Sequence, residues 1–172
     1  MITKNQIKLI RSLRIKKNRI KHNLFVAEGE KIIDELLNSN LNLSHLFTNK
    51  DNYGLSENYS VIKNKELKQI SNLKTPNKVL GLFEIPKVIE IDFNKNIVAL
   101  EEINDPGNLG TIIRLCDWFG IKDIICTKNS VDCFNPKTIQ ASMGSISRVN
   151  ISYLDFDNLF EAKKYNMVAA DM

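Results

Sequence analysis

Apolar positions along this chain follow two spacings in turn, one typical of strands and the other of helices. Short apolar runs that predict buried strands occur first at 24–27 (LFVA) and last at 167–171 (MVAAD). Between them, apolar residues recur every three or four positions, as in the stripe formed by Ile32, Ile33, Leu36 and Leu37. This alternation predicts an α/β fold with a mostly parallel sheet that helices cover on both faces.

The predicted elements form two groups that meet at 86–96. In the first group Thr3 caps a helix with Ile7, Ile10 and Leu13 inward, and the basic residues after it are expected in a loop. Strands then follow at 43–49, 59–63 and 79–86, with a helix at 63–73. The second group has strands at 97–103, 123–127, 146–154 and 167–171, and helices at 109–119, 135–144 and 157–166. We therefore expect one domain at 1–92 and another at 93–172.

The composition is that of a globular chain. It has 172 residues, 43% of them hydrophobic, which is enough for a core. No apolar run approaches the ~20 residues of a membrane helix and no signal peptide is recognisable, so a soluble, cytoplasmic protein is expected. Cys116, Cys126 and Cys133 lack CxxC spacing and are expected to be buried thiols. His22 and His45 are isolated, and no metal site is predicted.

The net charge of +4 conceals an uneven distribution. Residues 1–22 hold eight of the 24 basic residues and no acidic one, so the rest carries 16 basic against 20 acidic residues, a net of −4. The eight are Lys4, Lys8, Arg11, Arg14, Lys16, Lys17, Arg19 and Lys21. Such a segment suits RNA phosphates, whose neutralisation releases counterions. An amphipathic helix with a solvated charged face is the alternative explanation.

The segment 104–120 (NDPGNLGTIIRLCDWFG) holds three of the seven glycines. It follows a predicted strand, at the carboxyl end where open α/β sheets bind ligands. Its PG pair predicts a turn, Asn108 is the candidate helix N-cap, Gly110 permits close approach of a backbone or ligand, and Gly120 is a typical helix stop. The spacing is neither GxGxxG nor GxxxxGK[ST], which excludes a nucleotide-dependent oxidoreductase and a P-loop protein.

The helix after this loop presents one arginine on its outer side. At 100° per residue, the face toward the sheet is predicted to contain Leu109, Ile112, Ile113, Cys116 and Phe119. Thr111, Arg114 and Trp118 lie roughly opposite. An outward guanidinium close to the ligand end of a sheet can hold a phosphate or a developing oxyanion. A solvated arginine without a partner is the alternative.

Several stretches resemble the SpoU/TrmH family of RNA methyltransferases, which belongs to the SPOUT superfamily of knotted enzymes. The residues DPGNLGTIIR at 105–114, followed by Asp117 and FG at 119–120, resemble the first motif of that family. A later helix and strand are similar in NPK at 135–137, ASMGS at 141–145 and RV at 148–149. Many members carry an RNA-binding domain similar to FVAEG at 25–29, TP at 75–76 and VLG at 79–81.

This resemblance implies a small N-terminal α/β RNA-binding domain followed by the first part of a Rossmann-like, normally knotted SPOUT domain. It implies methyl transfer from S-adenosylmethionine to a ribose 2′-hydroxyl of structured RNA, ribosomal rather than transfer RNA, by a homodimer. The family's asparagine and arginine fall on Asn108 and Arg114, and Glu28 and Gly29 fall in the RNA-binding stretch. Arg114 would stabilise charge on the attacking oxygen or clamp a phosphate, and Asn108 would orient the loop or bond to the substrate.

The second and third motifs of the family, which supply most of the donor pocket in its members, have no counterpart in this sequence. We therefore name no donor-binding residue. We expect this form to bind S-adenosylmethionine weakly or not at all and to be inactive alone, as a fragment of a longer enzyme. A shortened, non-catalytic RNA-binding or ribosome-associated module is the alternative.

Overall fold

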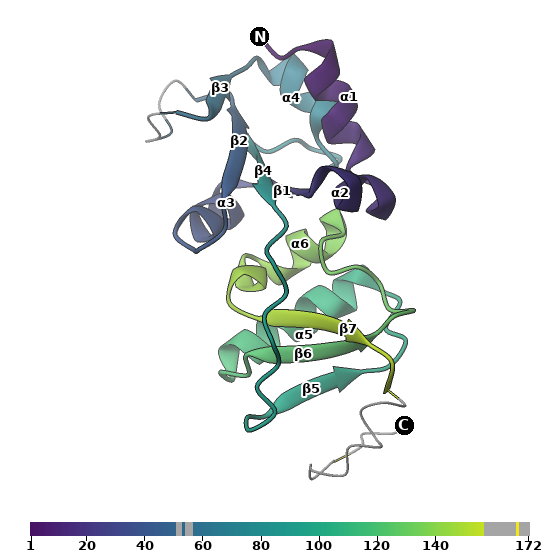
Figure 1. Ribbon diagram of the computed structural model, residues 1–172. Coiled ribbons are helices and arrows are strands. Elements are labelled where there is room, and N and C mark those ends of the chain that lie inside the picture. The colour runs from purple at the N-terminus through teal and green to yellow at the C-terminus, as the bar shows by residue number, and fades with distance from the viewer. Residues whose placement is uncertain (51–52, 54–56, 157–167, 169–172) are drawn as a thin grey trace.

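A computed structural model describes residues 1–50, 53, 57–156 and 168. Its elements form two units, each built on its own sheet, and the segment 85–96 joins them without a helix or strand (Figure 1). The helix predicted at 157–166 lies outside the described residues, as does the strand predicted at 167–171 except for Val168. No helix within the described ranges is long and apolar enough to cross a membrane.

The sheet of the N-terminal unit is mixed. Its strand order is β1-β4-β2-β3, with bounds Leu24–Glu28, Val79–Glu84, Leu43–Thr48 and Tyr59–Val61. Strand β4 pairs antiparallel with β1 and with β2, and only β2 and β3 are parallel. The prediction of a mostly parallel sheet is therefore wrong for this unit, because β4 returns between two strands that both run against it.

The described residues of this unit form the helices α1 (Lys4–Ser12), α2 (Lys16–His22), α3 (Glu30–Leu37) and α4 (Asn64–Ile70). Thr3 caps α1 as predicted, since its side-chain oxygen accepts from the Gln6 N–H. The Gln6 side-chain oxygen in turn accepts from the Thr3 N–H. The prediction that the basic residues after α1 form a loop is wrong. They form α2, which ends at Asn23 in the left-handed conformation.

The sheet of the C-terminal unit is parallel, as predicted, in the order β5-β6-β7. These strands span Ile97–Leu100, Asp123–Thr127 and Asn150–Leu154. Helix α5 (Pro106–Trp118) connects the first two, while α6 (Pro136–Ser142) and a 3-10 turn (Ser145–Ser147) connect the last two. The strand predicted from residue 146 therefore starts later, because Met143 and Gly144 are left-handed and the chain turns once more before β7.

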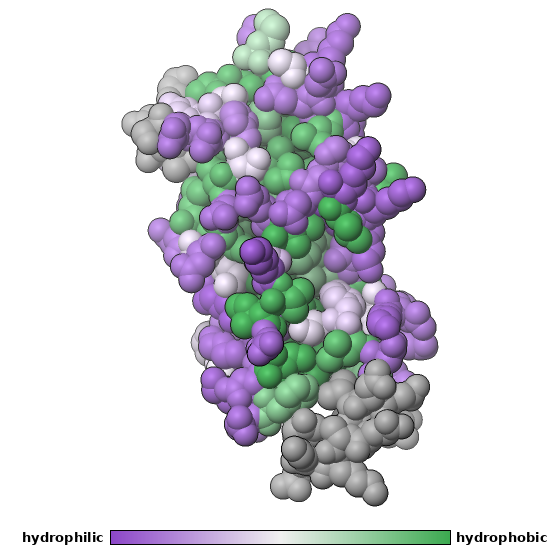
Figure 2. Space-filling view, viewed as in Figure 1, coloured by the Kyte–Doolittle hydropathy of each residue, from purple (hydrophilic) through white to green (hydrophobic). Residues whose placement is uncertain are grey.

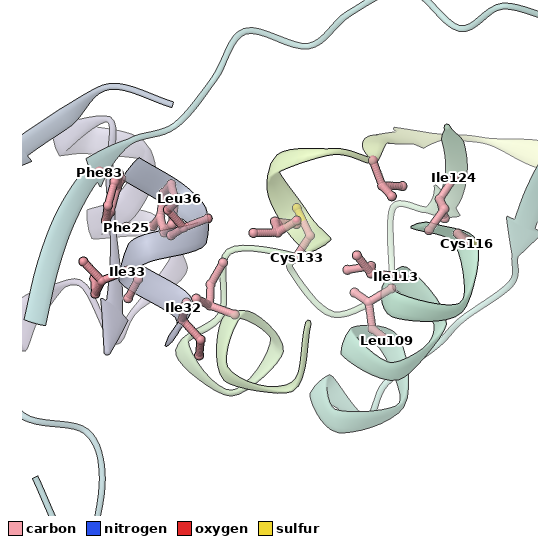
Figure 3. Packing of buried hydrophobic residues seen from close by; sticks show 14 of the residues in the cluster. Phe25, Ile32, Ile33, Leu36, Phe83, Leu109, Ile113, Cys116, Ile124 and Cys133 are labelled. Atoms are coloured by element: carbon pink, nitrogen blue, oxygen red, sulfur yellow. The ribbon is translucent and has the colours of Figure 1, made fainter. Parts of the chain in front are cut away.

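One hydrophobic cluster continues across both units (Figure 3). On the N-terminal side it contains Phe25, Ile33 and Phe83, and on the C-terminal side Leu109 and Ile113. Successive side chains of β1 point to opposite faces of the sheet, because side chains in a strand have a period of two. One face packs in this cluster, and the other packs in a second cluster, which α1 and α4 enclose. The ring of Phe25 lies 5.0 Å from that of Phe134, centroid to centroid, so aromatic packing joins the units directly.

Candidate functional site

The loop before α5 is organised by Asp105. Its carboxylate accepts a hydrogen bond from the Asn108 N–H at 2.8 Å, which makes Asp105 the N-cap of the helix. Pro106 occupies the first helical position, where its missing N–H leaves no bond unmade. The prediction that Asn108 caps the helix is therefore wrong. Asn108 is the third residue of α5, and its side chain is exposed.

Arg114 lies on the exposed side of α5. Within the described residues its guanidinium has no hydrogen bond or ion pair. Six residues separate it from Asn108, which corresponds to about 9 Å along the helix axis and roughly 120° around it. The structure thus leaves both side chains exposed on α5 without bringing them into contact.

Helix α5 buries most of the face that was predicted. Leu109, Ile113 and Cys116 are buried, but Phe119 is 73% exposed, against the prediction. The reason is the helix end: Gly120 is left-handed (φ 73°), and the Ile121 N–H reaches back to the Cys116 carbonyl at 2.8 Å. Ile121 packs on the core in place of Phe119. The predicted stop at Gly120 is confirmed.

Gly110 of α5 lies directly against α6. A Cβ atom at this position would lie 2.5 Å from the Cβ of Ala141 and 2.8 Å from the Thr138 carbonyl oxygen. The close approach predicted at this glycine is therefore confirmed, and the neighbour is the backbone of another helix.

Two loops meet at the carboxyl edge of the β5-β6-β7 sheet. The Val131 N–H donates to the Ile103 carbonyl at 2.8 Å, and the Glu102 N–H donates to Thr127 Oγ1 at 2.8 Å. The Tyr153 hydroxyl fastens the second loop by donating to the Val131 carbonyl. Hydrogen bonds therefore hold the segment that leads to Asp105 and Asn108 against the loop between β6 and α6.

The three cysteines are free and buried, as predicted. Burial raises the pKa of Cys126 to about 11 and that of Cys133 to about 12, so both remain neutral thiols at physiological pH. Among the described residues, no group of three or more His, Cys, Asp or Glu side chains could hold a metal ion.

Seven of the eight N-terminal cations form an exposed basic surface over α1 and α2, where hydrophilic side chains gather in Figure 2. They are Lys4, Lys8, Arg11, Arg14, Lys16, Lys17 and Lys21. Helix α2 places part of this surface close to the carboxyl edge of the second sheet, because Lys16 Nζ lies 5.5 Å from the centroid of the Tyr153 ring.

Arg19 does not belong to this surface. It is 2% exposed, its Nε and Nη2 donate to Asp132, and its Nη1 donates to the carbonyls of Leu13 and Arg14. The prediction that Arg19 joins an exposed basic track is therefore wrong. Its guanidinium connects the end of α1 to the loop between β6 and α6.

Glu28 and Gly29 are also buried, against their prediction as RNA-contacting residues. The Glu28 carboxylate is 5% exposed and accepts hydrogen bonds from Ser71 and Asn72. Gly29 begins α3 with φ 99°, a conformation that favours glycine. Both residues therefore act inside the N-terminal unit.

A second polar contact between the units was not predicted. Arg148 donates to Asp117 Oδ2 from Nε at 2.8 Å and to Glu35 Oε2 from Nη1 at 2.6 Å. Both this cluster and the Arg19–Asp132 pair join residues 113 positions apart. No local pattern of charges indicates such partners.

Among the described residues, no unpaired buried side-chain polar atom marks a pocket for S-adenosylmethionine. Their buried side-chain polar atoms without a hydrogen-bond partner are Asn72 Nδ2, in the N-terminal unit, and Ser152 Oγ, in the middle of β7. Neither lies in the loops at the carboxyl edge of the second sheet, so neither marks a place for the donor. We assign no donor-binding residue.

Comparison with known families gives two adjacent matches. Residues 95–171 match the SpoU rRNA Methylase family, and residues 4–81 match the MRM3-like substrate binding domain. Among curated proteins, the chain is 30% identical to the mitochondrial rRNA methyltransferase 3 of Xenopus laevis, over 87% of this chain and 40% of that protein. It is 28% identical to the 23S rRNA (guanosine(2553)-2′-O)-methyltransferase RlmP of Bacillus subtilis, over 88% of this chain and 66% of that protein.

Solved structures agree with these matches. A TrmH-family protein of Porphyromonas gingivalis superposes with a TM-score of 0.83 at 32% identity, over 95% of this chain and 68% of that one. The AdoMet-bound rRNA methyltransferase of Sinorhizobium meliloti gives a TM-score of 0.80 at 28% identity, over 94% and 66%. The chain thus spans 40% and 66% of the two curated relatives above. On its sequence motifs, both family matches and its fold, the chain belongs to the SpoU/TrmH family of RNA methyltransferases.

Proposed function

We propose that the chain is the RNA-binding domain and the first part of the catalytic domain of a ribose 2′-O-methyltransferase acting on ribosomal RNA, with S-adenosylmethionine as methyl donor. The names of its relatives support this substrate: one modifies 23S rRNA at a guanosine 2′-oxygen, and others are named rRNA methyltransferases. A solved relative binds AdoMet. The division at residue 92 and a cytoplasmic location remain predictions.

The observation that carries the proposal is the exposed guanidinium of Arg114 on the helix that begins with the family's first motif. The ribose hydroxyl must lose its proton as its oxygen attacks the methyl group, and the oxygen carries negative charge as that proton leaves. A guanidinium stabilises that charge, or holds the adjacent phosphate, through fixed N–H donors. Because guanidinium retains its proton, Arg114 is no general base. Asn108, exposed in the first turn of the same helix, would bind or orient the substrate.

The position of the basic surface supports RNA as the substrate. Helix α2 rests on the loop that follows β6, through Arg19 and Asp132, and that loop is hydrogen-bonded to the segment preceding α5. RNA phosphates held on α1 and α2 would therefore lie beside the carboxyl edge of the second sheet, where Asn108 emerges.

A homodimer is part of the proposal. Leu115, Trp118 and Phe119 are 51%, 85% and 73% exposed at the end of α5. Large apolar side chains gathered on one face are typical of protein interfaces. A second copy packed there would cover them and would place α5, with Arg114, at the interface.

The test is methyl transfer from tritiated S-adenosylmethionine to transcribed rRNA, with protein expressed from the complete gene. Arg114→Ala should lower kcat by about 100-fold or more, the loss typical for a group that stabilises a developing oxyanion. The melting temperature should stay unchanged. Lys122→Ala is the control, since it removes an exposed cation at the amino edge of the same sheet. A normal rate for Arg114→Ala would refute the proposal, and RNA binding without transfer by the wild-type protein would favour the non-catalytic module.

A further inference from the structure

The buried carboxylate of Glu28 fixes the loop that follows α4. Ser71 Oγ donates to Glu28 Oε2 at 2.5 Å, and the Asn72 N–H donates to Glu28 Oε1 at 2.7 Å. Ser71 Oγ in turn accepts from the Leu73 N–H at 3.0 Å. A carboxylate with both oxygens engaged by one short loop leaves that loop little freedom.

The last turn of α4 and the loop after it hold two arginines of the basic surface. Arg11 Nε donates to the Gln69 carbonyl at 2.7 Å. Arg14 Nε donates to Asn72 Oδ1 at 2.6 Å, and Arg14 Nη2 donates to the Ser71 carbonyl at 2.9 Å. Residues 69–72 therefore bind Glu28 on the inner side and both guanidinium groups on the outer side.

The way Arg14 is bound decides which of its donors remain free. The loop accepts from Nε and from one N–H of Nη2, and the adjoining edge, formed by Nη1 and the second N–H of Nη2, has no bond among the described residues. That edge matches two oxygens of a phosphate. The side chain is exposed, so a phosphate can reach it. An arginine already held in one rotamer loses less conformational entropy when it binds.

We propose that Glu28 is a positioning residue for RNA binding: through residues 69–72 it orients Arg11 and Arg14 as a two-arginine site for backbone phosphates. This rests on the proposed RNA-binding function. Glu28 is buried and cannot contact RNA itself, so it acts through Arg11 and Arg14, whose side chains are exposed.

The experiment measures the affinity of the full chain for a fluorescent rRNA transcript at several KCl concentrations. Arg14→Gln should weaken binding about threefold to tenfold at low salt and reduce the slope of log K against log salt by about 0.7–0.9, the loss of one phosphate contact. Glu28→Gln should weaken binding by at least this factor, since it misplaces both arginines. The double variant should bind no more weakly than Glu28→Gln alone, because the Arg14 contact is already lost in that variant.

The sign of the Glu28→Gln effect separates positioning from charge. Removing a negative charge would by itself strengthen binding to RNA, so weaker binding has to come from the misplaced arginines. Glu84→Gln, at an exposed position of β4, is the matched control and should bind as wild type or slightly more tightly.

Three results would overturn the inference: tighter or unchanged binding by folded Glu28→Gln, an unchanged salt slope, or additive losses in the double variant. Circular dichroism and melting temperature check folding. If Glu28→Gln does not fold, Ser71→Ala replaces it in the comparison of single and double variants with Arg14→Gln. Ser71→Ala removes one of the two hydrogen bonds to Glu28. Absence of RNA binding by the wild-type chain would instead refute the proposed function itself.

Discussion

At the scale of single residues, Arg19 differs from Lys17 and Lys21 only in its surroundings. All three are basic residues of α2, yet Arg19 is 2% exposed and its neighbours are exposed. Its partner, Asp132, comes from the other unit. A buried arginine requires such a partner, because an unpaired charge away from water is strongly unfavourable.

Arg19→Gln should lower the free energy of unfolding by about 3 kcal/mol or more, since it leaves the Asp132 carboxylate partly buried without its counter-ion. Urea unfolding measured by circular dichroism checks this. Lys17→Gln, one exposed cation of the same helix, should change the value by less than about 0.5 kcal/mol. Equal effects of the two substitutions would show that the pair contributes nothing beyond a surface charge.

Residue roles at the candidate site could be predicted only where the signal is local. The exposure of Arg114 follows from helical spacing, and the Gly120 stop follows from the residue type. The cap was misassigned although Asp105 before Pro106 is a recognisable N-terminal signal. The burial of Glu28 could not be predicted from local sequence, because its hydrogen-bond partners, Ser71 and Asn72, lie more than 40 positions away.

At the scale of elements, α5 and α6 pack through Gly110. Two effects oppose each other at this position: alanine favours a helix over glycine by about 1 kcal/mol, and a Cβ atom 2.5 Å from Ala141 costs about 1–3 kcal/mol of strain. The strain prevails because the second close atom, the Thr138 carbonyl oxygen, belongs to the backbone and cannot rotate away.

Gly110→Ala should therefore destabilise the protein by up to about 2 kcal/mol despite its better helix propensity. Thermal unfolding provides the measurement. Thr111→Ala, at the next and exposed position of α5, is the control and should stay within about 0.5 kcal/mol of wild type. A more stable Gly110→Ala variant would mean that the two helices can separate without loss.

At the scale of the whole molecule, the order of the described strands and helices was predictable from the hydrophobic pattern except for α2, and their arrangement was predictable only in part. The parallel sheet follows from alternating elements in the C-terminal unit. The mixed sheet does not, because β4 inserts between β1 and β2 by pairings distant in sequence. The shared core was not predicted either. The sequence indicates that Phe25 and Leu109 are each buried, but it does not indicate which residues they pack against.

The shared core predicts that the two units unfold together. Phe25, Ile33 and Leu36 of the first unit lie in one cluster with Leu109 and Ile113 of the second, so separation would expose both sides to water. Differential scanning calorimetry should show a single transition whose calorimetric and van't Hoff enthalpies agree. Phe134→Ala should lower the temperature of the whole transition. Two resolved transitions would contradict this expectation.

The contact between Arg19 and Asp132 also bears on how such proteins can be recombined. A chimera that receives its first unit from one relative and its second from another inherits each half of this ion pair from a different parent. Unless the two combined units carry compatible residues at positions 19 and 132, the interface between them buries an unpaired charge. Exchanging positions 19 and 132 together, along with the Phe25–Phe134 and Glu35–Arg148 pairs, preserves these contacts between the units.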